Sequence, residues 1–138
     1  MRKRFVIVAM LLAVFILGVC NCTRQESVHF DEVPALDAVQ LKETLSSDKY
    51  TMIEFGGRHC IPCRKMQPVL SELAKEHGNS IVIANVFVQE QMELGRQYKV
   101  RLIPTQVIFD KEGKEIFRHT GFWEKSEVLA KWKELKII

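Results

Sequence analysis

Two cysteines separated by two residues, Cys60 and Cys63, are the side chains of this sequence with the clearest capacity for chemistry. They enclose Ile61 and Pro62 at a point where a predicted strand and loop pass into a predicted helix. At a helix start the first thiol meets unpaired backbone N–H groups and the positive end of the helix dipole, which favour the thiolate. Because the thiolate is the species that attacks a disulfide, the pair predicts thiol–disulfide exchange.

The surroundings of the pair favour the same chemistry. Lowering a thiol pKa from about 8.5 to about 7 raises the thiolate fraction at neutral pH from roughly 3% to about half. Arg58, His59 and Arg64 flank the cysteines and add positive charge that acts in this direction. Pro62 suits the first turn of a helix, where its missing N–H costs little.

Other uses of the pair are less consistent with the sequence. A zinc site needs four ligands, and the only other cysteines are Cys20 and Cys22, far away in the chain, so no metal is predicted. Covalent haem requires a histidine directly after the second cysteine, where this chain has Arg64. An inert structural disulfide remains an alternative, although a four-residue loop stabilises a domain little.

Composition indicates one globular domain with a short additional segment. The chain has 138 residues, 47% hydrophobic and 27% charged. The net charge of +3 comes from Arg2, Lys3 and Arg4, since setting these three aside leaves 17 of the 20 basic side chains against 17 acidic ones. The neutral remainder lacks the basic surface that binding to phosphates requires, so nucleic acid is not an expected partner.

The amino terminus predicts export from the cytoplasm. Three cations precede the uncharged apolar run Phe5–Val19, as in the basic and hydrophobic regions of an export signal. Leu17-Gly18-Val19-Cys20 resembles the lipobox of bacterial lipoproteins and makes Cys20 a candidate lipidation site, although Val19 departs from the small residue preferred there. Alternatively, residues 5–23 stay as a helical anchor of roughly 28 Å, close to the ~30 Å hydrocarbon core.

These features divide the chain into three parts. Residues 1–22 are a signal peptide or a membrane or lipoprotein anchor, 23–32 a polar tether, and 33–138 the folded domain. The basic end should stay in the cytoplasm, so the domain is expected on the extracytoplasmic, periplasmic face of a bacterial cell envelope.

Periodicity within the domain predicts helices alternating with strands. Past Cys63, apolar side chains follow helical spacing up to Gly78, with Pro68 inside the helix, and Ile81–Val88 has the apolar character of a central strand. Helices are further predicted at 34–46, at 90–98 and after an N-cap at Ser126, and strands at 51–55, 105–109 and 115–119, the last two forming a hairpin. This order predicts an α/β fold with a mixed sheet covered by helices.

Over residues 34–135 the sequence resembles the thioredoxin family. Glu54 lies six residues before the first cysteine, and Pro68 follows the second by five, the spacing of the family's helix kink. Ile103-Pro104-Thr105 resembles the family's Ile-Pro-Thr, which contains a cis-proline, and Gly121 follows the hairpin as in the family. The resemblance implies a thioredoxin fold preceded here by the anchor segment.

The resemblance also implies roles for individual residues. Cys60 would be the nucleophile that forms a mixed disulfide with a protein substrate, and Cys63 the buried thiol that resolves it. Glu54 matches a buried carboxylate that helps to deprotonate the second cysteine; the alternative is a surface position on its strand. Pro104, if cis, would stack beside the disulfide and let the Ile103 backbone pair with a substrate strand. No cofactor is expected apart from the redox-active disulfide between Cys60 and Cys63.

Departures from the family pattern point to a dedicated partner. His59 stands where members usually have tryptophan, and Gly56-Gly57 replaces an aromatic-small pair. Asn85 stands where a lysine often accompanies the buried acid. His59, Ile61 and Pro62 would still border the substrate, and His59 is equally consistent with a solvated loop residue.

We expect a monomeric protein-disulfide reductase. Ile61 and Pro62 offer no strong donor to a thiolate, which favours a potential nearer the thioredoxin end of the scale (about −270 mV) than the oxidising end (about −120 mV). An anchored reductant needs electrons from across the membrane, and similar tethered members work with DsbD/CcdA-type transmembrane thiol carriers. Two alternatives stay open: a copper chaperone that uses the thiol pair with His59, and a binding module without redox cycling.

Overall fold

A computed structural model describes residues 33–138 of the chain. The predicted signal or anchor segment (1–22), the tether (23–32) and the candidate lipidation site Cys20 lie outside the described residues. Within residues 33–138, no helix combines the length and the apolar character needed to cross a membrane.

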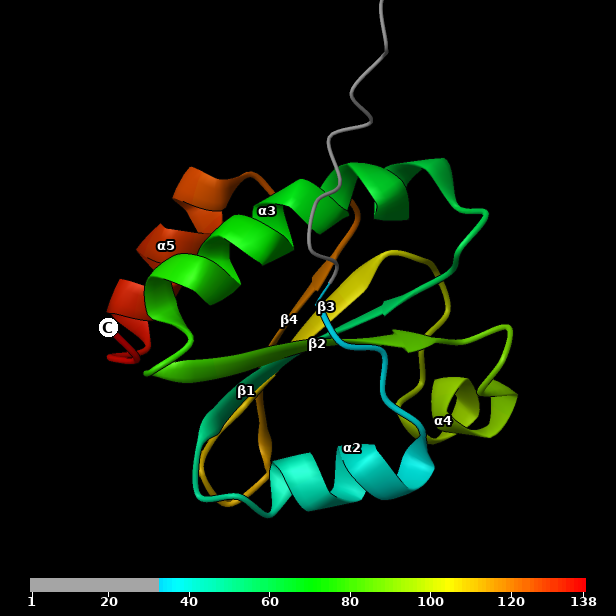
Figure 1. Cartoon of the computed structure of the whole chain (residues 1–138), viewed down its shortest axis with the longest axis horizontal. Helices are drawn as coiled ribbons and strands as arrows, with labels where there is room; N and C mark the ends of the chain where they lie inside the picture. Colours follow the sequence, from blue (N-terminus) through cyan, green and yellow to red (C-terminus); the bar gives the residue numbers. More distant parts are fainter. Residues whose placement is uncertain (1–32) are drawn as a thin grey trace, which may run out of the picture.

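The described residues form a mixed four-stranded sheet with helices on both faces (Figure 1). The strand order is β2-β1-β3-β4; β1 and β2 are parallel, and the other two pairs are antiparallel. This arrangement confirms the predicted α/β class with a mixed sheet. In chain order the elements are α2 (Ala38–Leu45), β1 (Tyr50–Gly56), α3 (Ile61–His77), β2 (Ile81–Phe87), α4 (Met92–Gln97), β3 (Thr105–Phe109), β4 (Glu115–Thr120) and α5 (Lys125–Glu134).

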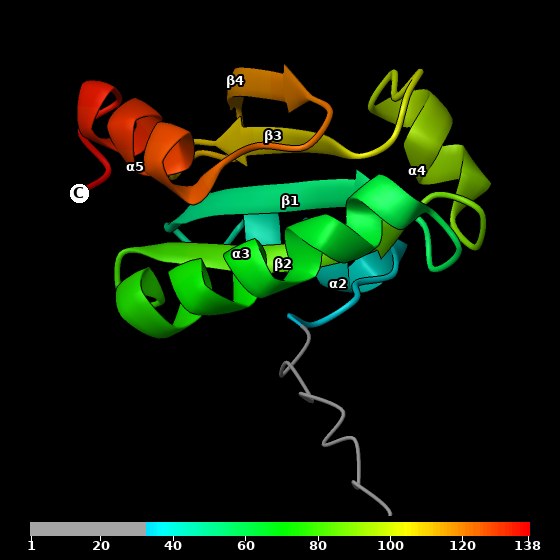
Figure 2. The same cartoon turned by 90° about the horizontal axis from the view of Figure 1, so that it is seen from above.

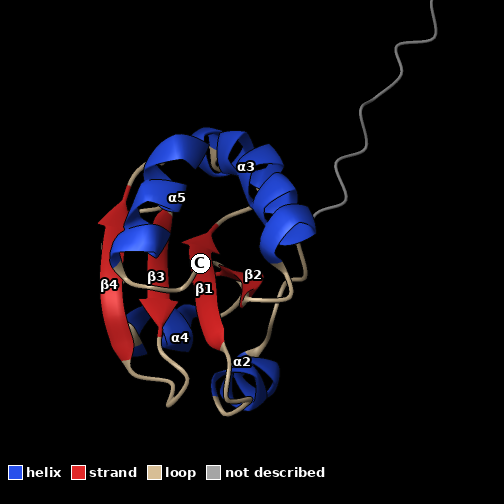
Figure 3. Cartoon of the chain, turned by 90° about the vertical axis from the view of Figure 1, so that its left-hand side faces the viewer, coloured by secondary structure: helices blue, strands red, loops and turns tan. Residues whose placement is uncertain are grey.

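The helices form two layers, with α3 and α5 on one face of the sheet and α2 and α4 on the other (Figures 1 and 3). Figure 2, which looks from above, shows α3 and α5 in the same layer. Lys125 of α5 joins Glu72 and Glu76 of α3 through ion pairs of 3.2 and 2.6 Å. Since side chains alternate along a strand, Met52 enters the core beneath α3 and α5, whereas Ile53 enters the core beneath α2 and α4.

Helix α3, which carries the two cysteines, has the bounds that the periodicity predicts. It begins at Ile61, has Pro62 in its first turn and ends at the C-cap Gly78. Pro68 lies inside the helix, where it cannot donate a backbone hydrogen bond to the preceding turn. The buried side chains fall on the face turned toward the sheet and are Cys63, Met66, Leu70, Ser71 and Leu73.

The prediction of a central strand at Ile81–Val88 is wrong, because β2 lies at the edge of the sheet. Its side chains are nevertheless buried on both faces, since α3 covers one face and α2 the other. Residues 34–36 run along its outer edge: the Leu36 N–H donates to the Asn85 carbonyl, and the Asn85 N–H donates to the Pro34 carbonyl, both at 2.8 Å. The strand therefore has the apolar composition of an interior strand without occupying that position.

The first helix also starts later than predicted, at Ala38 instead of Pro34. Asp37 is its N-cap, and one carboxylate oxygen accepts hydrogen bonds from the N–H groups of Val39 and Gln40 at 2.9 Å. The residues before Asp37 are extended because their backbone pairs with β2.

The N-cap predicted for the last helix, Ser126, is likewise wrong. Helix α5 begins at Lys125 with Glu124 as its N-cap, and the Glu124 N–H donates to the Glu127 carboxylate at 3.3 Å. The other predicted strands and the short helix α4 occupy the expected regions, and the β3–β4 hairpin is confirmed.

Gly113 in the hairpin loop should be intolerant of a side chain. Its φ is +76°, and a Cβ atom there would lie 2.7 Å from the backbone carbonyl oxygen of Leu45 at the end of α2. We predict that Gly113→Ala lowers the free energy of unfolding by about 1–2 kcal/mol, measured by urea denaturation. The neighbouring exposed variant Glu112→Ala is the control, and equal stability of the two variants would contradict the prediction.

Candidate active site

Cys60 and Cys63 form a disulfide at the amino end of α3. Their Cα atoms lie 5.2 Å apart, Cys60 is the N-cap of the helix, and its Sγ accepts a hydrogen bond from the Cys63 N–H at 3.2 Å. The Cys60 sulfur therefore occupies the position where the helix start favours negative charge. Cys60 is half-buried, whereas Cys63 is only 2% exposed, so solvent and a protein substrate have better access to the first cysteine.

The residues that flank the cysteine pair differ in their contacts and in their exposure. The Arg58 guanidinium pairs with Glu90 at 2.6 Å and lies 4.2 Å from the centre of the Phe87 ring. Arg58 also lines the cavity beside the buried Cys63. His59, Ile61 and Pro62 are exposed and border the pair, as expected for residues that a substrate could contact.

Glu54 lies within the sheet beneath the disulfide and not at the surface. It is 1% exposed and projects from β1 toward the layer of α3 and α5. A Cβ atom at Gly56 would lie 2.9 Å from Glu54 Oε1 and 3.5 Å from Cys63 Sγ, so the carboxyl and the buried sulfur share one neighbourhood. Gly56 keeps this space free of a side chain, which explains a small residue at the place where β1 ends.

Burial changes the acidity of this carboxyl. Removal from water raises the pKa of Glu54 from 4.5 to about 8, and the side chain of Gln106 on β3 partly offsets the rise. No hydrogen bond of good geometry joins the two side chains, and within the described residues neither carboxyl oxygen has another partner. A carboxyl with a pKa near that of a thiol, about 8.5, can exchange a proton with it at little cost.

Glu54 belongs to a row of polar side chains that crosses all four strands. The register places Asn85 of β2, Glu54 of β1, Gln106 of β3 and His119 of β4 opposite one another in turn. Asn85, where a lysine was expected in the family, hydrogen-bonds the Gln67 amide at 3.0 and 3.2 Å. Gln106 is not among the site residues predicted from the sequence. The signal for it was a polar residue between apolar ones in a buried strand.

The peptide bond between Ile103 and Pro104 is cis, as the family resemblance implies. Thr105, the next residue, pairs with Phe55 at the end of β1 that leads to the cysteines, and the Gly121 N–H donates to the Pro104 carbonyl at 2.8 Å. This end of the sheet carries exposed apolar side chains on three separate segments, namely Ile61, Leu102 and Phe122.

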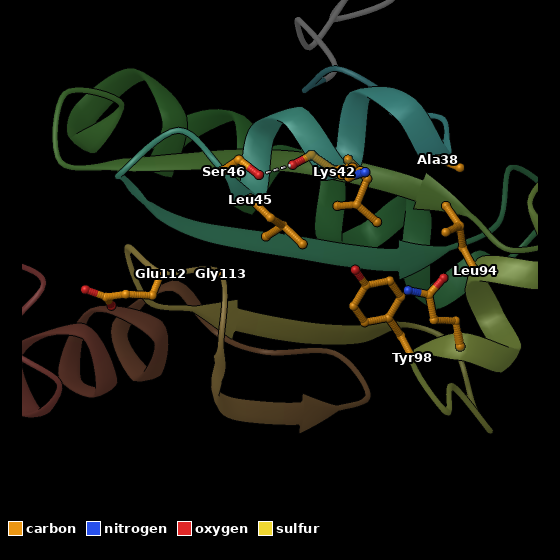
Figure 4. A pocket seen from close by; sticks show the side chains of 10 residues that line it. Ala38, Lys42, Leu45, Ser46, Leu94, Tyr98, Glu112 and Gly113 are labelled. Carbon is orange, nitrogen blue, oxygen red and sulfur yellow. Dashed lines mark hydrogen bonds between the residues drawn. The ribbon is translucent and has the colours of Figure 1, made fainter.

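Cavities lie at several places around the sheet, including one of about 280 Å³ lined by residues such as Leu102, Thr105 and Arg118. Another of about 220 Å³ opens beside the buried cysteine and is lined by residues that include Gly57, Cys63 and Arg64. A larger one of about 420 Å³ lies on the other face, between α2, α4 and the hairpin loop, where Leu45 and Tyr98 point toward it (Figure 4). It holds no cysteine and belongs to the face opposite α3, so it is not part of the redox site.

Within residues 33–138, no group of three or more histidine, cysteine, aspartate or glutamate side chains is placed to hold a metal ion.

A cysteine pair at the start of α3, a buried carboxyl beneath it and a cis-proline at the same end of the sheet define a thioredoxin-type redox site. The model of the family Thioredoxin matches residues 32–134. Thioredoxin 2 of Chlorobaculum tepidum is 35% identical over 92 residues, which cover 67% of this chain and 84% of that protein.

Two further comparisons agree. The bifunctional thioredoxin reductase/thioredoxin of Mycobacterium leprae is 32% identical over 97 residues, 70% of this chain but 21% of that protein. A mutant thioredoxin from Halobacterium salinarum superposes with a TM-score of 0.68 at 24% identity, covers 75% of this chain and 90% of its own, and supports the fold. The chain belongs to the thioredoxin family, and this membership together with the Cys60–Cys63 disulfide identifies it as a thiol–disulfide oxidoreductase.

The raised pKa of Glu54 has a measurable effect on stability. Because folding favours the protonated carboxyl, the cost of burying its charged form is absent at low pH, and the free energy of unfolding should fall as pH rises from 4.5 toward 8. The expected slope is at most about 1.4 kcal/mol per pH unit. Urea denaturation of the oxidised protein and of Glu54→Gln between pH 5 and 9 should show this decline only in the unsubstituted chain. Parallel curves would rule out the raised pKa.

Proposed function

We propose that this protein is an extracytoplasmic, membrane-tethered reductant of protein disulfides. The observation that carries the chemistry is the pairing of an accessible Cys60 with a buried Cys63 above the protonatable Glu54. The amino-terminal sequence supports the location, and the apolar residues between the cysteines support the reducing direction.

The reaction starts with both cysteines reduced. The Cys60 thiolate attacks one sulfur of the substrate disulfide, forming a mixed disulfide and releasing the first substrate thiolate, which takes a proton from solvent. Cys63 then gives its proton to the Glu54 carboxylate and attacks the Cys60 sulfur, which releases the second substrate thiolate. Two electrons pass to the substrate, and the Cys60–Cys63 disulfide remains.

The site also offers a place for the substrate backbone. Among the described residues, no backbone hydrogen bond involves the N–H or the carbonyl of Ile103, so both can pair with an extended substrate segment. Ile61, Leu102 and Phe122 supply apolar contacts around this position and take the role of the aromatic surface that His59 and Gly56-Gly57 replace.

Tethering defines the source of electrons. A reductant held at the outer face of a bacterial membrane cannot be reduced directly by cytoplasmic reductants, so its disulfide must receive electrons through the membrane. A DsbD/CcdA-type transmembrane thiol carrier has the required chemistry, and the amino-terminal segment keeps the domain beside it.

The mixed disulfide provides the direct test of substrates and carrier. Cys63→Ala removes the resolving thiol, so partners should accumulate as covalent adducts on Cys60 that mass spectrometry identifies after non-reducing electrophoresis. Cys60→Ala/Cys63→Ala is the control and should lose these adducts, so any capture that remains belongs to Cys20 or Cys22. A Cys63→Ala chain that captures no cell-envelope protein would contradict the proposed exchange.

The direction of electron flow has its own test. We expect the purified domain to reduce the disulfides of insulin and to equilibrate with glutathione at a potential nearer −270 mV than −120 mV, both being approximate reference values. Failure to reduce insulin together with a potential above about −150 mV would identify an oxidant instead.

A further inference from the structure

Gln106 is a buried polar residue that the reaction so far does not use. It lies on β3 directly opposite Glu54 of β1 and is fully buried. Neither its Nε2 nor its Oε1 has a hydrogen-bond partner among the described residues, and the same holds for both Glu54 oxygens. Two adjacent side chains with four unpaired polar atoms in a packed interior are unusual, because natural proteins pair nearly all such groups.

The chemistry of an amide fits a carboxyl that changes its protonation state. A carboxylate only accepts hydrogen bonds, whereas a carboxylic acid also donates one. An amide serves both states, since Nε2 can donate to the carboxylate and, after a turn about the last side-chain bond, Oε1 can accept from the acid. A leucine would fill the same space and serve neither state.

No charged side chain competes with Gln106 for this task. The other cross-strand neighbour of Glu54 is Asn85, which is uncharged and bonded to Gln67. His119 lies one strand beyond Gln106 and contacts the Phe122 carbonyl at 3.2 Å. On α3, the buried Cys63 shares the neighbourhood of Glu54 at Gly56. The other charged or titratable side chains of α3 and α5 are exposed or half-exposed, namely Arg64, Lys65, Glu72, Lys75, Glu76, His77, Lys125, Glu127, Lys131, Lys133 and Glu134.

We propose that Gln106 is the positioning residue for Glu54: it holds the carboxyl toward Cys63 and sets the pH at which the carboxyl accepts the Cys63 proton. This inference rests on the proposed role of Glu54 as that proton acceptor. The direction in which Gln106 acts on Glu54 agrees with it, since the amide lowers a pKa that burial raises.

The test isolates the resolving step. The reduced protein is first mixed with the symmetric disulfide of 2-nitro-5-thiobenzoate, which leaves a mixed disulfide on Cys60 and releases one coloured thiolate. Stopped flow then follows the second coloured thiolate, which Cys63 releases, from pH 5 to 10. In Gln106→Leu we expect the rise of the rate with pH to move upward by about one unit, which is about a tenfold loss at neutral pH. The midpoint of thermal unfolding should stay equal or rise, because two unpaired buried atoms are removed.

A matched glutamine on the same side of the sheet gives the control. Gln67→Leu removes an amide that bonds Asn85 and not Glu54, so it should lower thermal stability and leave the pH position of the release unchanged. A loss of stability in Gln106→Leu without a pH shift would assign Gln106 a structural role and overturn the proposal.

The combined variant separates this inference from the proposed function. Glu54→Gln alone should slow release and remove the pH dependence that the carboxyl causes, and adding Gln106→Leu to it should change nothing further. If Glu54→Gln slows release but Gln106→Leu has the same effect in both backgrounds, Gln106 does not act through Glu54. If Glu54→Gln leaves the release rate and its pH dependence unchanged, the role of Glu54 fails and the inference fails with it.

Discussion

A carboxyl group buried within a β-sheet, with no charged partner, is unfavourable when ionised, and the structure is arranged around this one group. Glu54 projects from the face of β1 that α3 and α5 cover, and this helix layer keeps its side chain from solvent. The absence of a side chain at Gly56 leaves the carboxyl next to Cys63. The energetic cost of the charged form is what matches this acid to a thiol, because an ordinary surface glutamate would be far too weak a base.

The side chains around Glu54 fall into apolar cores, which stabilise the fold, and one row of polar residues, which contains the reactive carboxyl. Met66, Leu70 and Trp132 pack in the apolar core under α3 and α5. The second core, beneath α2 and α4, is mainly apolar, with Thr51 and Thr105 buried on the same face of the sheet. Against this background the polar row from Asn85 to His119 is confined to a single line across the sheet. A fold with two independent cores can carry such a line, because most of its buried surface lies elsewhere.

The sequence predicts the parts of this molecule that depend on local chemistry. The spacing of Cys60 and Cys63, the helical periodicity of α3 and the Gly-containing hairpin each define an element within a short stretch of chain. The edge position of β2 and the alignment of Gln106 with Glu54 depend on which strands pair and in what register, and a buried strand has the same composition at either place. Helix α2 starts later than predicted because Asp37 is its N-cap, and α5 starts earlier because Glu124, and not Ser126, is its N-cap.

The short pairing of residues 34–36 with β2 has a consequence for association between molecules. An open strand edge is a template for any extended chain, and this contact occupies part of the β2 edge. The opposite edge, β4, carries the charged pair Glu115 and Arg118, and charged side chains discourage strand addition. Both features therefore oppose the edge-to-edge pairing of the sheets of two molecules, which is a common route to aggregation.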